Sequence, residues 1–179
     1  IDEFLEIKSK YLIKNNNLNL IKNYIIRNQD APGNSSLIIY YLNQHLSYSN
    51  LDEACSLFDE IKSANDDKYI AKFKIYCLIN DNRKEEAQLN FDLINEIGFE
   101  DKFYENKFNF LMGYDESENI MNETSDKNIL NFHLSHRVNK NFSYDPNENT
   151  SKIIWKYLST SNLLESIDLV NLEDEAKIK

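Results

Sequence analysis

One short segment of the chain gathers the side-chain types that catalysis and metal binding use most often. His133 and His136 lie three positions apart in a helical pattern, and Arg137 follows directly. Two imidazoles at this spacing share one side of a helix and can bind a metal ion if Asp126 or Asp145 supplies a third ligand. The sequence contains no His-Glu-x-x-His and no Cys-x-x-Cys motif. We therefore predict no metal and no cofactor, and a catalytic site at these residues remains an alternative.

A structural interpretation of the same cluster competes with the chemical one. His133 lies at the edge of an apolar helical face, and His136 and Arg137 come at the carboxyl end of that helix, where carbonyl dipoles favour positive charge. The sequence has no Gly-x-Ser-x-Gly motif and too few glycines for a phosphate-binding loop. Its paired carboxylates fall at helix starts and on outer faces, where a solvated role is expected. These patterns favour a non-enzymatic protein.

The two cysteines, Cys55 and Cys77, both fall in apolar helical patterns. Two cysteines in a chain of this length do not make a disulfide framework. We expect two buried, reduced thiols, although adjacent helices would allow a single bridge. The sequence leaves the compartment open. It is consistent with a soluble protein that is cytoplasmic or, if a leader was removed, bacterial periplasmic, and the start at Ile1 favours a segment of a longer protein.

The elements that position these residues follow from composition. Among 179 residues only 3 are Gly and 2 are Pro, which predicts an all-α chain and argues against a turn-rich β fold. The apolar fraction of 41% is enough for a core, and the net charge of −10 argues against binding to nucleic acid or to an anionic membrane surface. No apolar run approaches the ~20 residues of a membrane-spanning helix.

A repeat with a period of 33 organises the first part of the chain. Ala54 and Ala87 are 33 positions apart, and the same shift relates Phe58 to Phe91. Matching apolar positions occur in three copies: Phe4, Leu37 and Ile70; Ile7, Tyr40 and Phe73; Ile13, Leu46 and Ile79; Ile21, Ala54 and Ala87. Each copy predicts two helices joined by an Asn-rich turn.

Local signals predict where the helices start and stop. Asn50 with Glu53, and Asn82 with Glu85, resemble capping boxes that would start the second helices of the second and third pairs. Gly98 stands where a helix ends in a left-handed residue. A further helix follows from Asp101, and we expect its apolar stripe to pack in the core rather than to line a ligand groove: Phe103, Tyr104, Phe108, Leu111 and Met112.

These features resemble a degenerate tetratricopeptide repeat. The second helix of that family carries a small residue followed four positions later by a large aromatic, as Ala54 with Phe58 and Ala87 with Phe91 do here. The family's Trp, its Leu-Gly pair and its turn Gly are absent, and its period is 34. The resemblance implies a right-handed superhelical stack of antiparallel helix pairs, an α-solenoid, and we expect three pairs and one further helix over residues 1–114.

Residues 115–179 depart from the repeat and predict a C-terminal helical region that caps the stack. A polar connection over 115–125 precedes a short helix over 126–138 and a loop over 139–150. A strongly apolar helix begins near Ile153, and Asn162 with Glu165 predicts the start of another.

The architecture predicts a scaffold that binds a protein or peptide on the concave face of the stack. Because the chain is acidic, the expected partner is neutral or basic. We expect the groove to be formed by side chains of the first helices of the pairs: Tyr41, Asn43, Gln44, Lys74 and Tyr76. The alternative is an accessory superhelical domain of a larger enzyme, such as a bacterial lytic transglycosylase, by analogy of fold.

Overall fold

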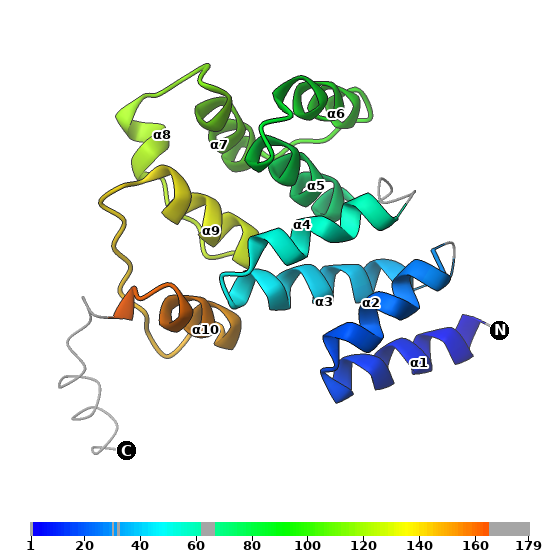
Figure 1. The fold of residues 1–179 in the computed structure, drawn as a ribbon. Coiled ribbons are helices and arrows are strands. Elements are labelled where there is room, and N and C mark those ends of the chain that lie inside the picture. The colour runs from blue at the N-terminus through cyan, green and yellow to red at the C-terminus, as the bar shows by residue number, and fades with distance from the viewer. Residues whose placement is uncertain (1, 30, 32, 62–66, 165–179) are drawn as a thin grey trace, which may run out of the picture.

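The computed structural model describes residues 2–29, 31, 33–61 and 67–164, and in this part helices joined by turns and loops make up the fold, with no strand. The predicted all-α class is therefore confirmed for these residues (Figure 1). The helices are α1 (Asp2–Asn15), α2 (Leu18–Arg27), α3 (Asn34–Ser47), α4 (Leu51–Glu60), α5 (Lys68–Asn80), α6 (Lys84–Glu96), α7 (Lys102–Met112), α8 (Glu118–Asn122), α9 (Ile129–Val138) and α10 (Lys152–Thr160).

The turns inside the first three helix pairs repeat one backbone conformation. Asn16, Ser49 and Asn82 have φ angles of 49°, 56° and 61°, in the left-handed region that residues other than glycine seldom adopt. These residues are 33 positions apart, and the amide of each donates to a carbonyl three residues back at 3.0 to 3.1 Å. The period of the sequence is thus also a period of the turn geometry, with Asn and Ser in the place where glycine is usual.

The two predicted capping boxes of the repeat are wrong. Asn50 precedes α4, but its side chain accepts no hydrogen bond from the first turn. Asn82 belongs to the turn, so α6 begins one residue later, after Arg83. Side-chain caps occur instead at helices where they were not predicted, for example at Asp67, which accepts from the amides of Tyr69 and Ile70 at 2.8 and 3.1 Å. The predicted partner of Asn162, Glu165, lies outside the described residues.

Most of the repeated apolar positions that the structure describes face the core, but Ile7 is 58% exposed. Ala54 and Ala87 are fully buried, as are Ile21 and Leu37, so the small residues allow neighbouring helices to approach closely. The aromatic stripe of α7 packs inward as predicted, with the Phe108 ring stacked on Phe91 at 4.0 Å. Gly98 has a φ of 78° after α6, which confirms the predicted left-handed helix end.

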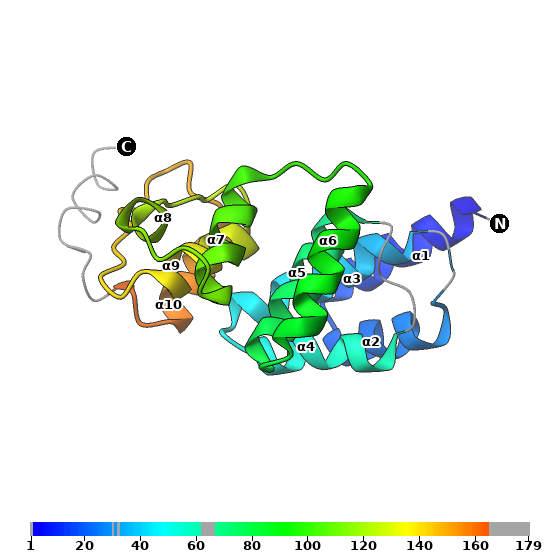
Figure 2. The same cartoon turned by 90° about the horizontal axis from the view of Figure 1, so that it is seen from above.

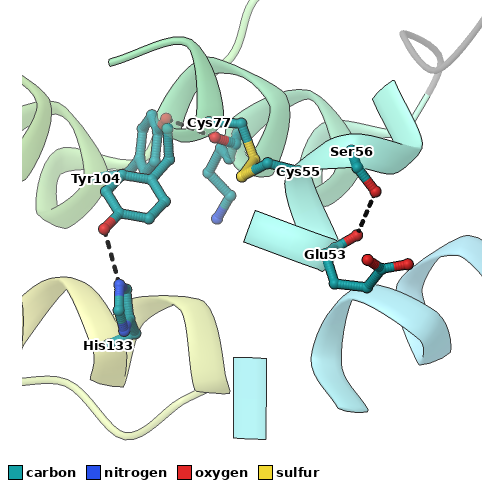
Figure 3. The surroundings of a disulfide bond; sticks show 8 residues. Glu53, Cys55, Ser56, Cys77, Tyr104 and His133 are labelled. Carbon is teal, nitrogen blue, oxygen red and sulfur yellow. Dashed lines mark hydrogen bonds between the residues drawn. A yellow bond between two sulfur atoms is a disulfide. The ribbon is translucent and has the colours of Figure 1, made fainter. Parts of the chain in front are cut away.

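Cys55 of α4 and Cys77 of α5 form a disulfide (Figure 3). The expectation of two reduced thiols is therefore wrong. Both residues lie on the faces that the second and third helix pairs turn toward each other, with 5.4 Å between their Cα atoms, a separation that suits a bridge. The bond joins the second helix of one pair to the first helix of the next.

The C-terminal helices pack back onto the first helices of the pairs. Figures 1 and 2 place α9 beside α3 and α7, and α10 beside α3. The predicted helix over 126–138 begins later, at Ile129, because Asn128 caps it by accepting from the Asn131 amide at 2.9 Å. The expected polar connection contains the short helix α8, and no helix occurs between 139 and 150.

The end of α8 is held by a buried lysine from α7. The Lys107 ammonium donates to the carbonyl oxygens of Ile120 and Glu123 at 2.5 and 2.6 Å. Burial lowers the pKa of Lys107 to about 8, and the nearby Glu123 carboxylate acts in the opposite direction. The side chain thus satisfies carbonyl groups that a helix terminus leaves without partners.

Candidate functional site

The structure brings the predicted cluster of His133, His136 and Arg137 to the wall of a cavity of about 380 Å³. The cavity lies where the turn between α3 and α4 meets α9 and α10. Its remaining lining comes from both the repeat and the C-terminal region: Leu46, Ser49, Leu51, Tyr157 and Ser161. Leu46 and Ser161, which are 115 positions apart in the sequence, therefore share one site.

A continuous chain of hydrogen bonds runs along this wall. The Tyr76 hydroxyl of α5 lies 2.8 Å from Nε2 of His133, and Nδ1 of His133 lies 2.8 Å from the Tyr157 hydroxyl. The same Tyr157 oxygen lies 2.8 Å from Nδ1 of His136. These hydrogen bonds therefore tie α5, α9 and α10 together, and Figure 3 shows His133 pointing from its helix toward the helices above it.

Burial keeps the side chains of this series of hydrogen bonds neutral. It lowers the pKa of His133 to about 3, and the charges of His136 and Arg137 act in the same direction. The pKa of His136 is lowered by burial and by Arg137. Burial raises the pKa of Tyr76 to about 12, although Arg137 favours the ionised phenol, and burial also raises the pKa of Tyr157. At neutral pH both imidazoles therefore carry a single N–H.

The partners of each hydroxyl group and ring nitrogen determine which atom donates the proton in each hydrogen bond. Within the described residues, Nε2 of His133 is the acceptor available to the Tyr76 proton, because the Arg137 guanidinium beside it is a donor only. His133 then carries its proton on Nδ1 and donates to Tyr157. The Tyr157 hydroxyl also has Ser161 as a partner, and we assign its proton to Nδ1 of His136, which lies 2.8 Å away. His136 is left with its N–H at Nε2, for which the described part of the chain supplies no acceptor.

The arrangement differs from a metal centre. In the described ranges, no three His, Cys, Asp or Glu side chains converge. Asp126, a candidate third ligand, accepts a hydrogen bond from Tyr144 at 2.8 Å, and Asp145 is exposed on the loop after α9. The histidine nitrogens that face Tyr76 and Tyr157 are occupied by hydroxyl groups.

The predicted groove residues do not form one open surface. Tyr41 and Tyr76 are buried, with exposures of 1% and 2%. Asn43 accepts from Tyr69 at 2.6 Å, and Gln44 accepts from Lys156 of α10 at 3.0 Å. Because Tyr76 bonds to α9 and Gln44 to α10, the C-terminal helices cover this face of the pairs at both residues. Lys74 lies apart from them, between α5 and α6.

An exposed apolar stripe on α6 was not predicted from the sequence. Leu89, Leu93 and Ile97 follow one another at intervals of four and are 60%, 51% and 69% exposed. An apolar cavity of about 170 Å³ opens beside them between α5 and α6, with these lining residues: Ala71, Lys74, Ile75, Asn90, Leu93, Ile94 and Ile97. The spacing of four residues between Leu89, Leu93 and Ile97 is present in the sequence. The repeat, however, predicted only that Ala87, Phe91 and Ile94 form the inward face of this helix.

Comparisons with protein-family models, with curated proteins and with solved structures find no match for this chain. Among the described helices, none has the length and apolar character needed to cross a membrane.

Proposed function

We propose that this chain is a non-enzymatic helical-repeat scaffold, a right-handed α-solenoid of the tetratricopeptide-like kind, that binds a protein or peptide. The recurrence of the left-handed turn at Asn16, Ser49 and Asn82 supports a stack of equivalent helix pairs. Each pair buries its apolar face against a neighbour, as Ala54 and Ala87 do. Such a stack offers helix faces to partners more readily than it builds a reactive centre.

The exposed stripe of α6 carries the proposal that a partner binds. Leu89, Leu93 and Ile97 extend over about 12 Å of helix, the length at which two turns of a partner helix meet them. α6 lies at the upper edge of the molecule in Figure 1 and in front of α5 in the view from above in Figure 2. A row of exposed leucine and isoleucine next to an apolar cavity is an unusual surface unless something covers it.

Charge indicates what kind of partner fits. Exposed Asp92 and Glu96 flank the stripe on one side, and exposed Glu85 lies one turn before Leu89. Lys74 is the basic residue that lines the apolar cavity. An amphipathic helix with leucines along one face and lysines or arginines at its edges would bury the stripe and pair with these carboxylates.

A designed peptide tests this assignment directly. The probe is a helix of about 14 residues, with leucines at intervals of three and four and lysines elsewhere. We expect Leu93→Ser with Leu89→Ser to weaken its binding at least tenfold, measured by fluorescence anisotropy, without a change in helical content. Leu20→Ser is the matched control, because Leu20 is an exposed leucine on α2, away from the stripe. Equal binding by the stripe variant and the control, or equal binding of a scrambled peptide, would contradict the proposal.

The disulfide indicates the kind of compartment in which the protein carries out this function. Bridges such as Cys55–Cys77 persist in oxidising surroundings and are rare where thiols are kept reduced. We infer that the protein works in an oxidising compartment, such as the bacterial periplasm. Thiol labelling of protein taken directly from its cells, with and without prior reduction, tests this; labelling before reduction would contradict it.

A further inference from the structure

We propose that the cavity between the α3–α4 turn, α9 and α10 binds a small carboxylate with an apolar body, and that Arg137 holds the carboxylate group. This inference is independent of the partner surface on α6. The cavity volume of about 380 Å³ falls at the small end of the range of ~300–1,000 Å³ typical of ligand pockets. Its lining joins polar groups on one side to Leu46 and Leu51 on the other.

The charge of the lining is opposite to that of the protein. The chain carries a net charge of −10, yet the described residues that line the cavity include one arginine and no carboxylate. Within the described residues, Arg137 forms no ion pair with an acidic side chain, and its guanidinium is exposed at the cavity. The guanidinium hydrogen-bonds to the Tyr76 hydroxyl, and its remaining N–H groups suit a carboxylate, which a planar guanidinium binds through two parallel hydrogen bonds.

Neutral donors stand beside the guanidinium. The proton order along Tyr76, His133 and Tyr157 leaves the N–H of His136 on Nε2, without an acceptor in the described chain. Ser161, which lines the cavity, shares a hydrogen bond with Ser49 at 2.8 Å. These groups can donate to the second oxygen of a bound carboxylate without any change in protonation.

The single positive charge of the cavity determines which class of anion fits it. With His136 neutral, the cavity offers one positive charge, which balances a monoanionic carboxylate. A phosphate dianion would require a proton on Nδ1 of His136. That proton would reverse the hydrogen bond from Tyr157, whose hydroxyl would then have to donate to another neighbour such as Ser161. The apolar wall formed by Leu46 and Leu51 favours a ligand with a short hydrocarbon part over acetate.

Titration with hexanoate, followed by calorimetry and by the NMR signal of the Arg137 side chain, tests the proposal. We expect hexanoate to bind at least tenfold more tightly than hexanamide, which has the same shape without the charge, and more tightly than acetate or inorganic phosphate. Arg137→Gln should weaken hexanoate binding at least tenfold, whereas Arg83→Gln, an exposed arginine paired with Glu86 on α6, should leave it unchanged.

Several outcomes would overturn the inference. Equal binding of hexanoate and hexanamide would show that the charge is not recognised, and this comparison uses the unaltered protein. Tighter binding of phosphate than of hexanoate would contradict the assignment to a monoanion. Unchanged hexanoate affinity in Arg137→Gln, or no binding by any probe, would likewise contradict the site.

Discussion

The Tyr76 hydroxyl lies 2.8 Å from Nε2 of His133, so one hydrogen bond joins the third helix pair to the C-terminal region. Tyr76 is 2% exposed, and water has little access to replace the contact. The bond also fixes the tautomer of His133 and, through it, the orientation of Tyr157 and His136.

Removing this hydroxyl should destabilise the fold without emptying the core. We expect Tyr76→Phe to lower the free energy of unfolding by about 1–2 kcal/mol, because the ring still fills its place while Nε2 of His133 loses its partner. Urea denaturation measures the effect. Tyr11→Phe is the matched control, since Tyr11 is 63% exposed, and its effect should be close to zero. Equal effects of the two substitutions would mean that the bond contributes nothing.

Stability should fall as the pH is lowered below 6.5. The pKa of His133 is about 3 in the folded protein, below the usual value of 6.5, so the unfolded chain binds more protons between these values. The groups around this imidazole, Tyr76, Tyr157, His136 and Arg137, offer no carboxylate to stabilise its charged form. We expect a loss of about 1–2 kcal/mol between pH 7 and pH 5 that is attributable to His133.

The matched variant for this pH dependence is His133→Gln, which keeps a hydrogen-bonding side chain but does not titrate. It should be less stable than the wild type at pH 7, and the difference between the two proteins should shrink toward pH 5. Parallel pH profiles of unfolding would contradict the role of His133.

Loss of the disulfide should weaken the junction between the second and third helix pairs. Cys55 and Cys77 are 22 positions apart, and closing a loop of that length in the unfolded chain is worth about 3 kcal/mol. We expect Cys55→Ala with Cys77→Ala to lower the free energy of unfolding by about that amount in thermal or urea denaturation. A reducing agent should destabilise the wild type and leave this double variant unaffected, and a wild type insensitive to reduction would be inconsistent with the bond.

The left-handed turn at Asn82 predicts opposite outcomes for two small residues. Asn82→Ala should lower the free energy of unfolding by about 1 kcal/mol, because a Cβ without a polar group is strained at a φ of 61°. Asn82→Gly should leave stability equal or higher, since glycine adopts this conformation without strain. Thermal denaturation compares the two, and a more stable alanine variant would contradict the turn geometry.

Composition and periodicity predicted the helical class and the inward apolar positions, because both depend on local pattern. Leu37, Ala54 and Ala87 are buried as the repeat requires. The capping box at Asn82 failed because Asn82 belongs to the turn and α6 starts one position later, whereas Asn50 precedes α4 without accepting a hydrogen bond from its first turn. The disulfide depended on which helix faces meet, and that is a property of packing between pairs.

The site was found in part. His133, His136 and Arg137 were singled out by residue type alone, but their neighbours Ser49 and Tyr157 come from distant elements and share no motif with them. The groove prediction assumed that the first helices of the pairs are open to solvent. Nothing in the sequence around Gln44 or Tyr76 indicated that α10 would bind to Gln44 and α9 to Tyr76.

The docking of α9 and α10 onto α3 has a consequence for how the molecule unfolds. In an open stack each pair touches only its neighbours, and the ends can fray while the middle persists. Here Ser49 bonds to Ser161 across 112 positions, and Thr160 donates to the carbonyl oxygen of Ser47 across 113. These links close the chain on itself, so the second pair cannot open without releasing the C-terminal helices. We therefore expect the helix pairs and the C-terminal helices to unfold as one cooperative unit, in a single steep transition rather than in steps.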